Sequence, residues 1–113
     1  MITIYHNPRC SKSRQGLAIV EASGQNFEVV KYLDIPFSEE KLLEVVKLLG
    51  VKPIDLVRKN EAIWKEQFKG KTISDGEVIS AMIAHPKLIE RPIVVNGNKA
   101  VVGRPPESIC DIL

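Results

Sequence analysis

Residues 2–14 read ITIYHNPRCSKSR and combine the signals of a strand, a turn and a helix. The first four residues are rich in β-formers, and Asn7-Pro8 stops them with a pair that favours a turn. Ser11 or Ser13 can then act as the N-cap of a helix. The stretch therefore predicts a strand, a tight loop and a helix in immediate succession, with a cysteine in the loop.

The segments on either side complete a small sheet. The helix is expected to stop at Ser23-Gly24, and residues 27–33 form a second strand, which gives a βαβ unit with a right-handed crossover. Near the other end, apolar runs at 92–95 and 100–102 flank Asn96-Gly97, a strong hairpin signal. A final short helix is expected to begin at Pro105-Pro106 and to place Ile109, Cys110 and Leu113 on one face.

The middle of the chain is predicted to be helical. Residues 38–50 carry an apolar stripe at helical spacing and end at a glycine. A short helix is expected over 53–58, and a longer one runs from Ser74, with a capping box, to Pro86. The lysine-rich segment 60–72 is predicted to be an exposed, mobile loop.

This order of elements predicts the fold class. It is an α/β arrangement with a thioredoxin-like layout: a small mixed four-stranded sheet, with a helical insertion between the βαβ and ββα halves. The 113 residues show no repeat or linker, so a single domain over 1–113 is expected.

Composition argues against nucleic-acid binding and against a membrane protein. Lysine and arginine exceed aspartate and glutamate by only 16 to 14, which leaves no electrostatic footprint for nucleic acid. No leader segment and no apolar run of about 20 residues is present, so a cytoplasmic protein that does not bind membranes is expected. Cys10 and Cys110 are therefore expected to be reduced thiols.

Cys10 has the setting of a thiolate nucleophile. Helix N-termini and nearby cations lower a thiol pKa, and Cys10 precedes a helix and has Arg9, Lys12 and Arg14 as neighbours. The expected substrate-binding residues of this loop are Ser11, Lys12 and Arg14.

Ser13 completes a Cys-x-x-Ser pattern. Its hydroxyl is expected to bond the Cys10 thiolate at the position where a dithiol protein has a resolving cysteine, so the mechanism is monothiol. An inert buried cysteine is the alternative, although such residues avoid polar turns. A tyrosine phosphatase needs an arginine six positions after its cysteine, where this chain has Gly16.

Four ordered motifs carry a family resemblance. HNPRCSKSR at 6–14, LVRKN at 56–60, HPKLIERPIVV at 85–95 and GRP at 103–105 resemble the signatures of the glutaredoxin-linked arsenate reductases. Together they span nearly the whole chain. Two departures are visible, since Ser11-Lys12 replaces small residues and the chain ends without that family's C-terminal extension.

The resemblance implies roles for residues far apart in sequence. Cys10 attacks arsenate, His6 and Ser13 support the thiolate, and the Arg91-Pro92 bond is a cis-proline facing the nucleophile. The arginines implied to contact the oxyanion are Arg58, Arg91 and Arg104, whose planar forks suit such ligands.

The implied reaction is an oxidoreductase step in arsenic detoxification. Arsenate is reduced to arsenite with glutathione as co-substrate and glutaredoxin as partner, and neither a bound cofactor nor a metal is expected. Cys110 is expected to be a small hydrophobe, with internal resolution of a Cys10 adduct as the alternative. Two other functions stay open: a redox-responsive regulator binding RNA polymerase, and a general glutathione-linked thiol oxidoreductase.

Overall fold

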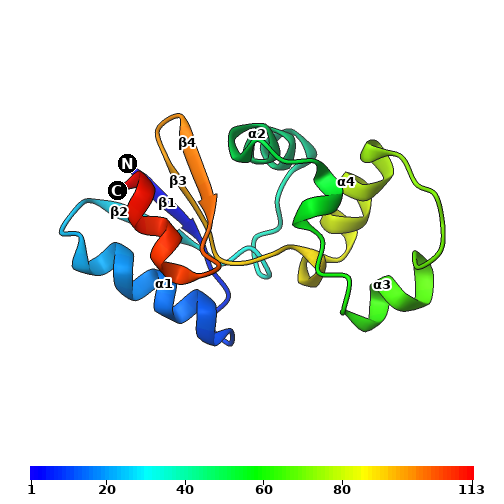
Figure 1. Cartoon of the computed structure of the whole chain (residues 1–113), viewed down its shortest axis with the longest axis horizontal. Helices are drawn as coiled ribbons and strands as arrows, with labels where there is room; N and C mark the ends of the chain where they lie inside the picture. Colours follow the sequence, from blue (N-terminus) through cyan, green and yellow to red (C-terminus); the bar gives the residue numbers. More distant parts are fainter. The chain divides into compact units, whose positions relative to one another are not determined.

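A computed structural model describes all 113 residues, and backbone contacts divide the chain into two compact units (Figure 1). The first unit comprises Met1–Ile35 and Arg91–Leu113, and the second comprises Pro36–Glu90. The second unit corresponds to the predicted helical insertion. The single domain over 1–113 stays a prediction.

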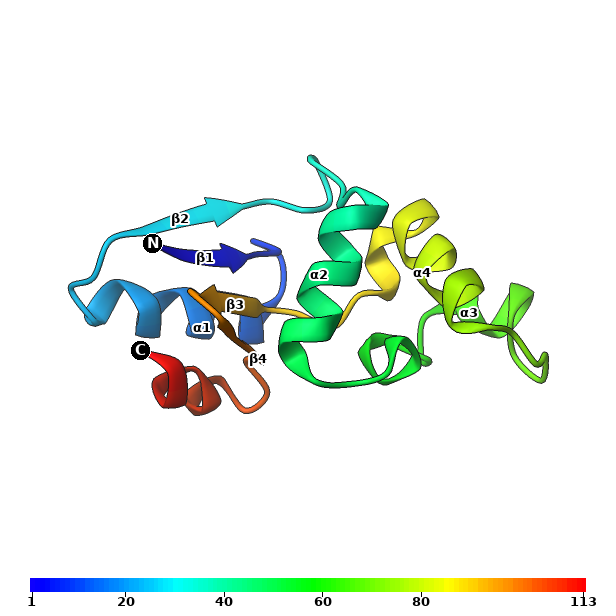
Figure 2. The ribbon, with the colours of Figure 1, turned by 90° about the horizontal axis from the view of Figure 1, so that it is seen from above.

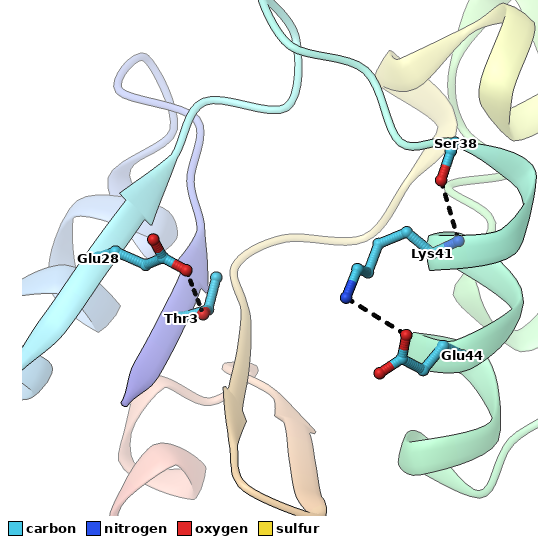
Figure 3. Close-up of polar contacts among 5 residues, drawn as sticks. All are labelled: Thr3, Glu28, Ser38, Lys41 and Glu44. Carbon is cyan, nitrogen blue, oxygen red and sulfur yellow. Dashed lines mark hydrogen bonds and ion pairs between the residues drawn. The ribbon is translucent and has the colours of Figure 1, made fainter.

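The first unit contains the predicted mixed sheet of four strands. Its strands are β1 (Ile2–Tyr5), β2 (Phe27–Val30), β3 (Ile93–Asn96) and β4 (Lys99–Val102). The sheet order is β2-β1-β3-β4, with β1 parallel to β2 and antiparallel to β3. The parallel register pairs Thr3 with Glu28, and the Thr3 hydroxyl donates to the Glu28 carboxylate over 3.0 Å (Figure 3).

Two helices pack side by side in the first unit (Figure 2): α1 (Ser11–Ala22) and the 3₁₀ helix η3 (Pro106–Ile112). Both contribute to one hydrophobic core with the sheet. The fully buried members of this core are Ile2, Ile4, Val20, Val94 and Ile109. Alternating residues of the short strands thus point to the face that these helices cover.

The second unit is helical, as predicted. It contains α2 (Glu39–Leu49), η1 (Pro53–Leu56), α3 (Ala62–Gln67), α4 (Asp75–Ala84) and η2 (Pro86–Leu88). Helix α4 packs against α2, η1 and η2. The Ser38 hydroxyl accepts from the Lys41 N–H at the start of α2, and the Lys41 ammonium pairs with Glu44 (Figure 3). At the start of α4, Ser74 and Glu77 form the predicted capping box.

Two predicted short helices are present but differ in an end or a buried face, and one segment predicted to be an exposed loop contains a helix. The segment 60–72 contains α3, because Trp64 is buried and stacks on Phe68 with 5.1 Å between ring centroids. The helix over 53–58 ends at Leu56, since Val57 is extended and forms a β-bridge with Ile89. The last helix is 3₁₀ from 106 to 112, and its three-residue turn buries Ile109 but exposes Cys110.

Smaller differences concern element ends. Strand β2 stops at Val30, so residues 31–33 leave the sheet. Asn96 pairs with Lys99, which makes Gly97-Asn98 the hairpin loop and explains the positive φ of Gly97. No helix is long and apolar enough to span a bilayer.

Candidate active site

Cys10 lies at the junction of the first loop and α1. It is the N-cap residue itself, so neither Ser11 nor Ser13 caps the helix as predicted. Its N–H donates to the Asn7 carbonyl over 3.0 Å, and its carbonyl accepts from the Arg14 N–H over 3.0 Å. The thiol is half-buried. The backbone therefore fixes the sulfur next to the unpaired N–H groups of the first helical turn.

A buried polar network holds the loop in this shape. The Ser13 hydroxyl oxygen accepts the Asn7 N–H over 2.9 Å and lies 2.6 Å from His6 Nδ1. The Asn7 side-chain oxygen accepts the Arg9 N–H over 3.0 Å. All three network residues, His6, Asn7 and Ser13, are buried. The hydroxyl of Ser13 thus bonds the loop rather than Cys10, which corrects the expected hydroxyl–thiolate bond.

The charges around Cys10 favour its thiolate. Burial raises the pKa of the thiol, but the Ser13 N–H, the Arg91 guanidinium and the Lys12 N–H together lower the pKa below its ordinary value. Ser13 and Lys12 therefore act through their backbones, as donors of the first helical turn. This direction agrees with the thiolate predicted from the sequence.

Two of the three predicted arginines lie at the thiol. Arg104 Nη2 is 3.6 Å from the Cys10 sulfur, and Arg104 Nε donates to the Arg91 carbonyl over 2.9 Å. The Arg91-Pro92 bond is cis, as the resemblance implies, and so is Arg104-Pro105. Two guanidinium groups from opposite ends of the hairpin therefore meet the sulfur. Such forks match the oxygens of a tetrahedral oxyanion.

Close packing fixes the backbone behind these arginines. A Cβ atom on Gly16 would lie 2.7 Å from the Pro92 ring, and one on Gly103 would lie 2.8 Å from it. The same Cβ atoms would lie 2.9 and 3.0 Å from Ile109. The position that holds arginine in a tyrosine phosphatase thus has no room for any side chain, which argues against the phosphatase reading.

The other predicted loop residues lie around the thiol at the surface. Ser11, Lys12 and Arg14 are exposed. The Arg14 guanidinium donates to the Pro8 carbonyl over 2.9 Å, so it braces the loop. Its expected contact with a substrate stays a prediction, as do those of Ser11 and Lys12.

Arg58 belongs to the second unit. Its N–H donates to the Leu88 carbonyl over 2.7 Å, and its guanidinium lies 4.0 Å from the Glu90 carboxylate. Arg58 Nε is buried and has no hydrogen-bond partner. The role implied for Arg58 at the oxyanion stays a prediction.

The surroundings of His6 favour its neutral imidazole. Burial lowers its pKa below 6.5, and the positive charges of Lys31 and Arg14 lower it further. The sequence analysis missed Lys31, because only the pairing of β1 with β2 brings it near His6. Asn7 was predicted only as part of a turn with Pro8, and the hydrogen bond that its side chain accepts from the Arg9 N–H was not predicted.

Cys110 does not have the predicted apolar setting. It is exposed on η3, so it is not a core hydrophobe. No group of three or more histidine, cysteine, aspartate or glutamate side chains is arranged to hold a metal ion.

Comparisons with known proteins agree with this site. A protein-family model described as the ArsC family matches residues 5–112. The chain is 43% identical to an uncharacterized Escherichia coli K12 protein, YfgD, over 99% of this chain and 96% of that protein. It is 40% identical to a Haemophilus influenzae protein named arsenate reductase, over 99% of this chain and 98% of that one.

A solved structure agrees with these sequence comparisons. The structure of an arsenate reductase from Vibrio cholerae superposes with a TM-score of 0.94 at 45% identity, and covers 99% of this chain and 97% of that one. Further structural neighbours confirm the predicted thioredoxin-like fold.

Proposed function

The chain belongs to the ArsC family, and we propose that it reduces arsenate to arsenite with glutathione and glutaredoxin. The observation that carries this proposal is the meeting of the Cys10 sulfur with Arg104 and Arg91. A low-pKa thiol next to two guanidinium groups combines a nucleophile with a site for an oxyanion. Thiol attack on arsenate needs both, because the oxyanion has to be held next to the sulfur.

In the first step the Cys10 thiolate attacks arsenic. A sulfur–arsenic bond forms and one arsenic–oxygen bond breaks, and the leaving oxygen takes up protons and departs as water. Arsenic stays in the As(V) state. Arg91 and Arg104 hold the remaining oxygens and offset their negative charge.

In the second step a glutathione thiolate attacks the Cys10 sulfur. A sulfur–sulfur bond forms, and the electron pair of the sulfur–arsenic bond goes to arsenic, which leaves as As(III) in arsenite. Two thiols are oxidised to one disulfide while arsenic gains two electrons. Cys10 is left as a mixed disulfide with glutathione.

In the third step a glutaredoxin thiolate attacks the glutathione sulfur of this mixed disulfide. The Cys10 thiolate is the leaving group, and its lowered pKa favours departure. No second cysteine of this chain takes part, because Ser13 stands at the resolving position. The reaction belongs in the cytoplasm, where thiols are kept reduced.

The test is an assay of arsenite formation from arsenate, supplied with glutathione and glutaredoxin. The unchanged protein is expected to form arsenite, and Cys10→Ser is expected to lose at least about a thousandfold in rate, since removing a nucleophile removes the covalent route. A thioredoxin system without glutathione serves as the alternative donor.

Arsenite formation at full rate with thioredoxin alone would overturn the proposed donor. Its absence with every donor would overturn the arsenate proposal and favour a general thiol oxidoreductase or a regulator.

A further inference from the structure

A cavity lies beside the loop that leads to Cys10, within the first unit. Its volume is about 310 Å³, near the lower end of the range for small-molecule sites. One wall is formed by residues 6–9, which lead directly to Cys10, and the other by Lys31, Leu33 and Asp34 after β2. The mechanism above does not use this cavity.

The lining contains opposite charges that do not pair with each other. Lys31 and Asp34 flank a turn, in which the Asp34 N–H donates to the Lys31 carbonyl over 2.9 Å. Neither side chain forms an ion pair, and Arg9 forms none either. The cavity therefore offers two cations and one carboxylate, which suits a ligand with both charges.

Two buried side chains add unused hydrogen-bonding groups. His6 is 4% exposed and Asn7 is 7% exposed, and both line the cavity. His6 uses Nδ1 toward Ser13, and Asn7 uses its oxygen toward the Arg9 N–H. His6 Nε2 and the Asn7 amide nitrogen have no partner in the protein. Neither atom is among the buried polar atoms that lack a partner, so both are accessible and can bond a polar ligand in the cavity.

We propose that this cavity binds the zwitterionic γ-glutamyl end of glutathione, an inference that rests on the proposed use of glutathione. The α-carboxylate lies against Lys31 and Arg9 and accepts from the Asn7 amide, and the α-ammonium lies against Asp34. The cavity thus recognises glutathione by its γ-glutamyl end, away from the Cys10 sulfur with which the glutathione thiol reacts.

The test measures binding of S-methylglutathione, which has no free thiol, to the full chain by calorimetry and by amide NMR shifts. Saturable binding is expected, with shifts at residues 6–9 and 31–34. Lys31→Ala and Asp34→Ala are each expected to weaken binding about fivefold, the size expected for one partly exposed charge contact. The matched controls are Lys99→Ala and Asp111→Ala, exposed residues of the same unit.

An analogue without the α-amino group separates the zwitterion from a simple anion. On the unchanged protein, this analogue is expected to bind about fivefold more weakly than S-methylglutathione. On Asp34→Ala, the two compounds are expected to bind equally well. Equal binding of both analogues, or equal effects of all four substitutions, would overturn the proposal.

Cys10→Ser keeps these test results independent of the reaction, because the cavity does not include the sulfur. Binding by this variant supports the cavity even if no arsenite forms with any donor. Arsenite formation with glutathione and no shifts at 6–9 or 31–34 would overturn the cavity and leave the proposed function standing.

Discussion

The two units hold their arginines in different ways. In the first unit, Arg104 contacts the Cys10 sulfur and the Arg91 carbonyl, over a backbone packed without room for one more methyl group. In the second unit, Arg58 faces a carboxylate of its own unit, Glu90, at 4.0 Å. Dense backbone packing therefore fixes the thiol and its two arginines, whereas a longer ion pair holds the arginine of the helical unit.

Among the residues around Cys10, the largest effect is expected from Arg91. Arg91→Ala removes a group that both lowers the Cys10 pKa and offers donors to an oxyanion, so kcat/KM for arsenate is expected to fall about a hundredfold. Arg91→Lys keeps the charge but loses the fork and is expected to recover only part of the rate. An unchanged rate in Arg91→Ala would show that Arg91 neither activates Cys10 nor binds the oxyanion.

Arg58→Ala tests the other side of the comparison. This variant is expected to lose arsenate reduction, because it removes a contact to the oxyanion that the family resemblance alone implies. Steady-state kcat and KM for arsenate measure it, with Lys59→Ala as a neighbouring control. If both parameters are unchanged, Arg58 has no part in the reaction.

Glycine-to-alanine changes compare the packing of the two units. Gly16→Ala forces a Cβ to 2.7 Å from the Pro92 ring and is expected to lower the free energy of unfolding by about 1–3 kcal/mol. Gly76→Ala in α4 meets nothing closer than 4.0 Å and is expected to raise it by about 0.5 kcal/mol. Denaturant unfolding measures both, and equal changes in the two variants would contradict the contrast.

A smaller effect concerns pH. Because the pKa of His6 is lowered by folding, the unfolded chain binds this proton more readily, and stability falls as the pH drops from about 6.5 through the lowered value. His6→Gln is expected to flatten the dependence of the unfolding free energy on pH in this range. The control is His85→Gln. A slope that survives in His6→Gln would assign the dependence to other groups.

The smallest effect is expected from Cys110. This thiol is exposed on η3 and has no role in the proposed steps, so Cys110→Ser is expected to change stability by less than about 0.5 kcal/mol and to leave arsenite formation near normal. Loss of turnover in this variant would instead assign the resolution of Cys10 to an internal disulfide.

Local signals predicted the second unit better than the site. Ser38, Gly50 and the Ser74–Glu77 pair mark helix ends through their own hydrogen bonds or φ, so α2 and α4 follow from short stretches of sequence. Helix α3 was not predicted, because its N-cap residue, Glu61, forms no side-chain hydrogen bond that would mark the start of the helix.

The site depends on contacts between distant residues. Cys10 was predicted because a helix start and nearby cations are local features. Its contacts with Arg91 and Arg104, which follow it by 81 and 94 residues, depend on strand pairing between distant parts of the chain, so only the family resemblance predicted them. Ser13 was correctly predicted to stabilise the Cys10 thiolate, but through its hydroxyl rather than its backbone N–H. Sequence spacing cannot tell a hydroxyl contact from a backbone one.

The most direct test of whether Cys10 is a low-pKa thiolate is the pH dependence of its alkylation by iodoacetamide, measured in the Cys110→Ser background. Because only the thiolate reacts, the rate follows the thiolate fraction. We expect the rate to stay high as the pH falls through the range where an ordinary thiol, with a pKa of about 8.5, takes up its proton. We also expect Arg91→Ala to move the midpoint upward. A midpoint at the ordinary value, unmoved in Arg91→Ala, would contradict this expectation.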